Sequence, residues 1–181
     1  MDIKRNAFVF FLFLSLSSTG QKFITENSKV VFFSGAAIED ITAENAKAMS
    51  IFDTGSGDIA FSIPIREFKF AKSLMQEHFN EKYMDTEKFP KSTFQGKITG
   101  YVSSTSGTQV VRAQGKLMIH GITKDVDIPG TVEFVANKIM LKSNFMVKLD
   151  DYSVSRPKLL WQNIAEEVEV SIDFTFKPYE K

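Results

Sequence analysis

The chain has 181 residues, no cysteine, and equal numbers of basic and acidic residues, 22 of each. This length allows one domain with a sizeable core, and the lack of cysteine excludes both disulfides and an anchor attached through a lipidated cysteine. Because the chain is neutral overall and has no basic run, it offers no electrostatic footprint for nucleic acid or for an anionic membrane surface.

Residues 1–20 have the three-part pattern of a secretory signal peptide. Lys4 and Arg5 precede an apolar run from Phe8 to Leu14, and the small residues SLSSTG follow. This order is typical of a cleaved signal, and the apolar run is far shorter than the about 20 residues that a membrane-spanning helix needs. We therefore expect residues 21–181 to form the mature domain, without a transmembrane segment, in the periplasm or outside the cell.

From Val30 onwards, apolar and polar residues alternate over most of the chain. This period of two predicts half-buried β-strands. An apolar cluster at 30–33 opens the series, residues 36–52 are ambiguous, and the alternation is strong over 59–65. Near Arg66 the apolar positions change from odd to even numbers, so we expect a bulge or bend there.

Residues 71–84 are the one segment with helical spacing, since Leu74, His78 and Phe79 fall on one side of a helix. Strand patterns resume over 94–102, 111–119, 126–134, 139–149 and 168–176. Seven or eight strands joined by short turns favour an antiparallel meander, and closing it buries every apolar face and removes the edges. We predict an all-β fold, an antiparallel eight-stranded barrel with one short helix near one mouth.

The segment Gly115–Pro129 is expected to form two strands joined at a corner centred on residues 121–123. The strand phase places Leu117 and Ile119 inside the barrel. It places His120 outside, where backbone groups can hydrogen-bond to the ring. This segment therefore predicts a joint of the barrel rather than an active centre.

Four glycines share the inward face of the predicted strands: Gly96, Gly100, Gly115 and Gly130. An inward glycine either leaves volume for a ligand or relieves crowding where a strand bends sharply. The chain has 18 phenylalanines, most of them outside the signal, and such large flat side chains suit apolar cavity walls. The combination favours an elongated apolar cavity, although a dry core is the alternative.

The strand phase also predicts which side chains would contact a ligand. They are Phe61, Ile63, Phe68, Leu74, Phe79, Phe94, Ile98, Leu117, Phe145 and Phe174. Polar residues at the mouth, with Tyr83, Arg156 and Trp161 as candidates, would meet a head group.

No pattern in the chain makes a positive case for an enzyme. Asp53-Thr54-Gly55-Ser56 matches the loop of aspartic proteases, but those enzymes need two such carboxylates, and a polar turn explains the single copy better. His78 and His120, even with Asp125, lack the ligand spacing of a metal site. Phosphate-binding loops, nucleophile elbows and a catalytic cysteine are all absent. We predict no catalytic residue, no metal and no cofactor.

Three stretches resemble the YceI-like family, also described as lipid- or polyisoprenoid-binding. They are GKLMIHGITKDVDIPG at 115–130, the segment Ser73–Ile98, and NIAEEVEVSIDFTFKP at 163–178. Met118 replaces the family's usual threonine, and Lys72-Ser73 stands where many members have Arg-Asp. The resemblance implies an exported lipocalin-like barrel. In some members it holds a polyisoprenoid or an isoprenoid quinone.

The sequence thus predicts an exported, non-catalytic protein that sequesters an amphiphilic lipid, with a polyisoprenoid or isoprenoid quinone as the expected ligand. The alternative is a structural or stress-response module of the cell envelope, with a filled barrel, that acts through a protein partner. Both hypotheses leave room for a homodimer.

Overall fold

The computed structural model describes residues 20–35, 40–154 and 165–180. Residues 1–19 of the predicted signal peptide lie outside this range, as do Arg156 and Trp161.

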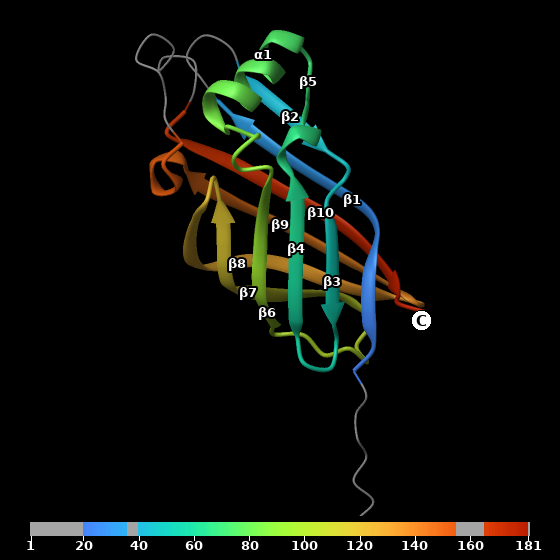
Figure 1. The fold of residues 1–181 in the computed structure, drawn as a ribbon. Helices are drawn as coiled ribbons and strands as arrows, with labels where there is room; N and C mark the ends of the chain where they lie inside the picture. The colour runs from blue at the N-terminus through green and yellow to red at the C-terminus, as the bar shows by residue number, and fades with distance from the viewer. Residues whose placement is uncertain (1–19, 36–39, 155–164, 181) are drawn as a thin grey trace, which may run out of the picture.

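Eight antiparallel strands close into a barrel, as the alternation predicts (Figure 1). The barrel strands are β1 (Lys22–Ser34), β3 (Met49–Asp53), β4 (Asp58–Pro64), β6 (Lys91–Thr99), β7 (Gly107–Ile119), β8 (Ile122–Val135), β9 (Lys138–Lys148) and β10 (Glu167–Pro178). Successive strands are hydrogen-bonded neighbours from β6 to β10, and the pairing of β10 with β1 closes the barrel.

Two further short strands, β2 (Ile41–Asn45) and β5 (Lys69–Phe70), extend one end of the wall. Strand β1 pairs with β3 only over its first residues, Lys22–Ile24, and pairs with β2 over Val30–Ser34. Where β1 leaves β3, the Thr25 hydroxyl accepts a hydrogen bond from the Ser50 amide (2.6 Å) and donates one to the Ser50 carbonyl (3.1 Å). These two side-chain hydrogen bonds take the place of backbone pairing between β1 and β3 at the point where β1 turns from β3 to β2.

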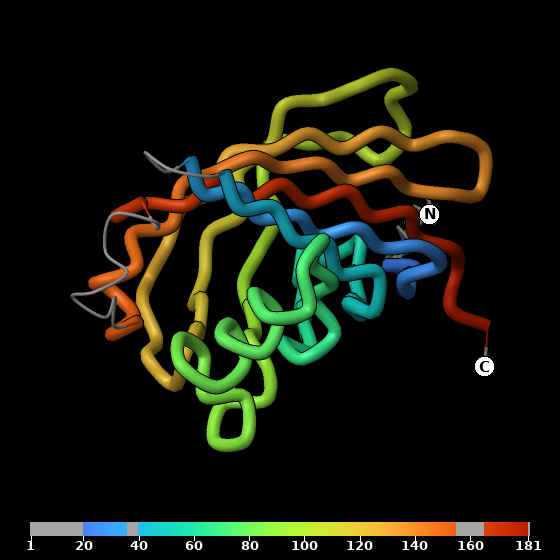
Figure 2. Tube along the Cα trace, turned by 90° about the horizontal axis from the view of Figure 1, so that it is seen from above, coloured from blue at the N-terminus to red at the C-terminus, as the bar shows by residue number. Residues whose placement is uncertain are grey.

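The divided wall is covered by the helical part of the chain. A 3₁₀ turn, η1 (Ile65–Glu67), supplies the bend expected near Arg66, and helix α1 (Ser73–His78) continues as a π-helical turn, η2 (Phe79–Tyr83). The helix is thus slightly shorter than the predicted 71–84. Seen from above, this green segment lies over the end of the barrel near β1 and β2 (Figure 2). A second 3₁₀ turn, η3 (Leu149–Tyr152), follows β9.

The predicted corner at 121–123 is instead a tight hairpin between β7 and β8. Ile119 pairs with Ile122, so His120 and Gly121 alone form the turn. Their φ angles are +50° and +76°, which match a type I′ turn, whose twist suits the flanking strands. The sequence placed the turn one residue too late because Gly121 occupies its second position rather than its first.

The inward glycines allow close approach of strands. Gly96 and Gly115 face each other across β6 and β7, and a Cβ on Gly96 would lie 2.8 Å from the Gly115 Cα. A Cβ on Gly130 would lie 2.8 Å from the Lys142 carbonyl. Gly100 follows β6 in a bend, with φ +91°. Relief of crowding, rather than space for a ligand, therefore explains these positions.

Replacing Gly115 with alanine should lower the free energy of unfolding by about 1–3 kcal/mol, because its Cβ would meet the backbone of β6. Gly35→Ala is the matched control, since its Cβ would meet only side-chain atoms at ordinary contact distances, those of Phe33 at 3.5 Å and of Asp40 at 3.8 Å. Urea denaturation of both variants measures the difference. Equal stability of the two variants would contradict the close approach of β6 and β7.

Candidate functional site: an apolar cavity

The end of the barrel opposite the helix is filled by aromatic rings. Phe52, Phe174 and Phe176 have no exposed surface, and the Phe174 ring centroid lies 5.9 Å from that of Phe176. Tyr101 packs against Phe52 at 5.6 Å and donates a hydrogen bond to the Thr54 carbonyl at 3.0 Å. Because these rings interlock and the phenol is satisfied, this half of the barrel is a dry core.

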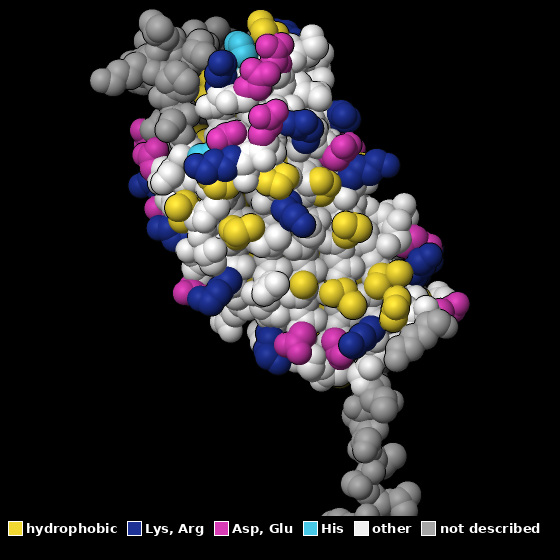
Figure 3. Space-filling view, in the orientation of Figure 1, with side chains coloured by type: hydrophobic (Ala, Val, Ile, Leu, Met, Phe, Trp, Pro, Cys, Tyr) yellow, Lys and Arg dark blue, Asp and Glu magenta, His cyan; other side chains and the backbone are white. Residues whose placement is uncertain are grey.

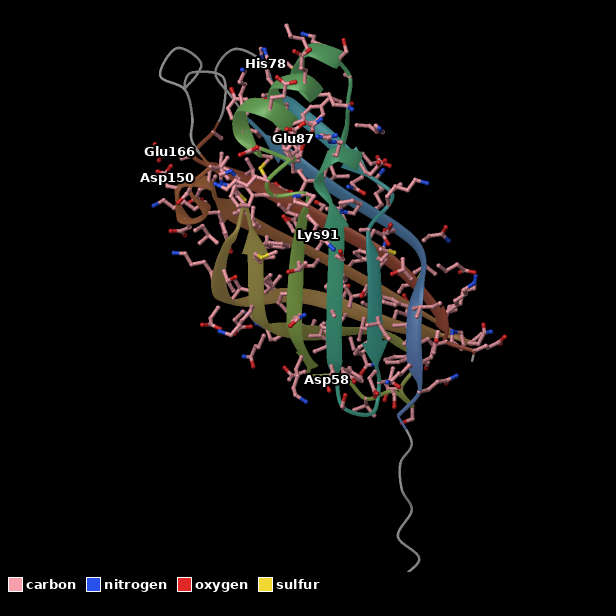
Figure 4. All side chains as sticks on the ribbon, in the orientation of Figure 1. Asp58, His78, Glu87, Lys91, Asp150 and Glu166 are labelled. Atoms are coloured by element: carbon pink, nitrogen blue, oxygen red, sulfur yellow. The ribbon has the colours of Figure 1, made fainter. Side chains whose placement is uncertain are left out.

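The half beneath the helix encloses a cavity of about 310 Å³, near the lower end of the range for small-molecule sites. Its walls come from every barrel strand except β3, and β2, η1, β5, α1, η2 and η3 complete them. The lining is mainly aliphatic and aromatic. Figure 4 shows that His78 lies at this helical end, whereas Asp58 marks the filled end.

Eight of the predicted ligand contacts are brought together in the cavity wall. They are Phe61, Ile63, Phe68, Phe79, Phe94, Ile98, Leu117 and Phe145. Their role in binding a ligand stays a prediction.

The other two predicted contacts are not part of the wall. Leu74 is 60% exposed, because the helix turns Met75 and His78 of α1 and Phe79 of η2 toward the cavity instead. Those three residues are spaced by three and four positions, and Leu74 lies one residue out of that phase. Phe174 lies behind Phe61, with ring centroids 5.0 Å apart, in the filled half.

Two residues of the wall that holds the helix, Phe32 and Phe70, were not among the predicted contacts. Phe32 of β1, Phe68, Phe70 of β5 and Phe79 of η2 form a cluster, with the Phe32 ring stacked on Phe79 at 5.4 Å and Phe70 5.0 Å from Phe79. Phe32 stands in the run VVFF, where the lack of alternation hides which side chain faces inward. No residue of α1 or η2 is fully buried, so this cluster is the main attachment of the helix to the barrel.

The wall includes a few polar side chains. The Ser34 hydroxyl accepts a hydrogen bond from the Ala165 amide (3.0 Å), and the Ser143 hydroxyl donates one to the Pro129 carbonyl (2.7 Å). Burial raises the pKa of Tyr83 above its ordinary value, and burial together with the Asp151 charge raises the pKa of Tyr152. Both shifts move the titration of the phenol further above pH 7, where an ordinary tyrosine is already neutral.

The residues that suggested catalysis or a metal have other surroundings. The Asp53 carboxylate accepts hydrogen bonds from the amides of Gly55 (2.9 Å) and Ser56 (3.2 Å), as in an Asx turn. The ring of His120 contacts Phe89, with centroids 4.4 Å apart, and its Nδ1 lies 3.3 Å from the Tyr152 carbonyl. Over the described ranges, no three His, Asp or Glu residues are grouped closely enough to hold a metal ion.

None of the helices in the described residues combines the length and the apolar character that crossing a bilayer requires.

Replacing Phe79 with alanine should loosen the helix, because it removes the ring that contacts Phe32, Phe68 and Phe70. We expect amide hydrogen exchange over 73–83 to become at least tenfold faster, given the about 0.5–1.5 kcal/mol that each aromatic pair contributes beyond its burial. Leu74→Ala on the same helix is the control, since Leu74 is exposed. Equal protection in the two variants would show that the aromatic cluster does not hold the helix.

The phenol of Tyr83 should titrate above its ordinary pKa of about 10, because burial disfavours the phenolate. The folded pKa is raised, so this group's contribution to stability is complete below about pH 10 and is lost as the pH rises through the folded value. Subtracting the phenolate absorbance of Tyr83→Phe from that of the native chain isolates this titration. A midpoint at or below about 10 in the folded protein would refute the buried environment.

Known proteins share this architecture. A family model described as the YceI-like domain matches residues 21–176. A polyisoprenoid binding domain from Saccharophagus degradans, implicated in plant cell wall breakdown, is 16% identical, with a TM-score of 0.75 over 87% of this chain and 98% of that chain. BcnA from Burkholderia cenocepacia is 19% identical, with a TM-score of 0.70 over 82% of this chain and 95% of that chain.

The YceI protein of Campylobacter jejuni is 16% identical, with a TM-score of 0.55, and the match covers 100% of this chain and 94% of that chain. At such identities these structures establish a shared fold, and no curated protein sequence matches the chain. The family model spans nearly all of the predicted mature domain and agrees with the resemblance of the three sequence stretches. This chain belongs to the YceI-like family.

Proposed function

We propose that this protein is an exported, non-catalytic carrier that holds the apolar tail of an amphiphilic lipid, an isoprenoid, in its cavity. The observation that carries the proposal is the division of the barrel, which is filled with aromatic rings at one end and hollow under the helix. The pattern of residues 1–20 supports export to the periplasm or beyond. The similarity to a polyisoprenoid binding domain supports this class of ligand.

The size of the cavity limits how much of a tail it encloses. At about 30 Å³ for each water-sized group, a volume of about 310 Å³ corresponds to about two isoprene units. Burial contributes ~0.8 kcal/mol for each methylene, and therefore about 3–4 kcal/mol for each isoprene unit. A longer tail would extend past the helical end without adding this full contribution.

The alternative, a filled barrel that acts through a protein partner, has less support. The cavity argues against complete filling. On the face shown in Figure 3, hydrophobic side chains lie in separate small groups among charged ones. Met49 and Ile51 of β3 are examples of exposed apolar residues, and scattered exposure of this kind is usual for a soluble domain.

The dependence of affinity on tail length tests the proposal. Isoprenoid alcohols of one to four units should bind the purified protein with an affinity that rises at least tenfold from one unit to two. The increase should then level off at about three units, because the cavity is full. Native mass spectrometry or calorimetry measures the series. Absence of binding at every length would contradict the carrier function.

Filling the cavity from within should abolish this binding. Ala113 of β7 lines the cavity, so Ala113→Phe would place a ring in the space of the tail at a stability cost of about 1–3 kcal/mol. Val110→Phe on the same strand is the control, since Val110 is 78% exposed. Circular dichroism verifies that both variants fold. Undiminished binding by folded Ala113→Phe would place the ligand elsewhere.

A further inference from the structure

Strands β8 and β9 are paired over only part of their lengths. Their ladder covers residues 130–135 of β8 and 138–143 of β9 and stops there. Beyond it, in the part of the chain that the structure describes, residues 122–129 pair only with β7 and residues 144–148 pair only with β10. Two strand edges without backbone pairing between them therefore border a slot in the barrel wall.

The slot lies in the hollow half of the barrel. The paired part of β8 belongs to the filled half, where Phe134 packs against Tyr101 with ring centroids 5.8 Å apart. The unpaired part of β8 carries Ile128, and the unpaired part of β9 carries Phe145 and Val147. These last three side chains all line the cavity. The two strands thus separate where the interior of the barrel is hollow.

Inward side chains beside the slot are less well covered than those of the paired region. Val132 is fully buried and Leu141 is 4% exposed, and they face each other where β8 and β9 pair. Val126, Ile128 and Phe145 share their inward phase but are only half-buried. Val126 is not part of the cavity wall, so its exposure comes from the slot and not from the cavity.

A groove on the outer surface reaches the same point of the wall. It lies over β1, β8, β9 and β10, and its walls include Pro129, Ser143 and Asn144. Ser143 and Ile172 line the cavity as well as this groove. The cavity and the outer groove therefore share part of one wall, beside the first unpaired residues of β8 and β9.

Side-chain contacts join the two edges of the slot at its ends. At the filled end, the Ser143 hydroxyl donates its hydrogen bond to the Pro129 carbonyl. At the helical end, Lys124 Nζ lies 3.8 Å from Asp151 Oδ1 of η3, and the His120 ring contacts the η3 backbone. The Lys124 and Asp151 side chains are 47% and 55% exposed, so this ion pair is weak and allows the edges to move apart.

The free edge of β8 is unsuited to pairing with a further strand. Pro129 has no amide hydrogen to donate, and Lys124, Asp125 and Asp127 are exposed along the edge. Proline and charged side chains are devices that protect strand edges from pairing with other chains. Because the inward residues of the slot are apolar, it suits the passage of an apolar chain better than the addition of a peptide strand.

We propose that the slot between residues 122–129 and 144–148 is a lateral portal, through which the apolar ligand enters and leaves the cavity. This inference rests on the proposed carrier function and specifies the route of the ligand rather than its identity. Passage through the slot breaks no backbone hydrogen bond between β8 and β9. Entry under the helix, in contrast, requires the rings packed around Phe79 to separate.

Obstruction of the slot should slow ligand exchange without changing the affinity. Val126→Trp places a large ring in the slot but outside the cavity wall. When protein loaded with farnesol is mixed with excess deuterated farnesol, this variant should exchange its ligand about tenfold more slowly than the native chain, which corresponds to a barrier higher by about 1.4 kcal/mol. Native mass spectrometry at successive times follows the exchange, and circular dichroism verifies the fold.

The dissociation constant should stay the same, because an obstructed portal slows binding and release equally. Val110→Trp is the matched control, since this residue of β7 is 78% exposed and its replacement should leave the exchange rate unchanged. A loss of affinity in Val126→Trp in place of slower exchange would contradict the portal.

Two reversible cross-links compare the slot with the helical end. The chain has no cysteine, so cysteine pairs can be introduced without competing thiols. Lys124→Cys with Asp151→Cys joins the edges of the slot, whereas Arg66→Cys with Glu87→Cys joins the two ends of the helical segment. Both pairs replace exposed ion pairs with the same 3.8 Å separation. A bifunctional methanethiosulfonate should slow farnesol exchange in the first pair alone, and a reductant should restore it.

Unchanged exchange in both folded Val126→Trp and the cross-linked slot pair would overturn the portal. Slowing by the link between positions 66 and 87, without slowing by the link between positions 124 and 151, would assign entry to the helical end instead.

Amide hydrogen exchange tests the slot itself without any ligand. Alternate amides of residues 122–129 point into the slot, and they should exchange at least about tenfold faster than the amides of 130–135 that bond to β9. Equal protection of the two sets would show that the slot is closed. If the slot amides exchange rapidly but the native chain does not bind farnesol, the carrier function fails, and the portal fails with it.

Discussion

The pairing of β1 with β10 is the constraint on which the rest of the structure depends. It runs from Phe23 opposite Pro178 to Phe33 opposite Glu169, so the first and last strands of the domain complete the barrel. On its other side, β1 pairs first with β3 and then with β2. The Thr25 side chain hydrogen-bonds to the Ser50 backbone at the point where β1 leaves β3. One end of the barrel can therefore close tightly while the other end widens.

The side chains therefore pack differently at the two ends of the barrel. In the narrow end, the rings of Phe52, Phe174 and Phe176 are fully buried and pack against one another. In the wide end, β2, β5 and the helix take the place of barrel wall, and their rings pack against one another around Phe79 rather than across the interior. The aromatic cluster that holds the helix is thus also the reason that the space beneath it remains open.

The alternation of residues was sufficient to predict the barrel, since period two identifies both the strands and their inward faces. It also placed Phe61, Phe94 and Leu117 in the wall. It could not separate wall from core, because both consist of inward apolar residues, and Phe174 fell on the wrong side of that division. Only the packing of distant strands decides which inward side chains meet.

Other features lay beyond what a sequence pattern records. The turn at His120 depends on backbone angles, and Leu74 was misplaced by a single residue of helical phase. The roles of Gly96 and Gly115 were ambiguous in the sequence, because a close approach of two strands and an open cavity both favour a residue without a side chain.

The most direct test of the account is whether the protein, purified from the cells that make it, carries a lipid. Extraction with organic solvent followed by mass spectrometry should recover one isoprenoid lipid per chain. Recovery of no stoichiometric lipid, together with no thermal shift on adding isoprenoid quinones or alcohols, would contradict the account.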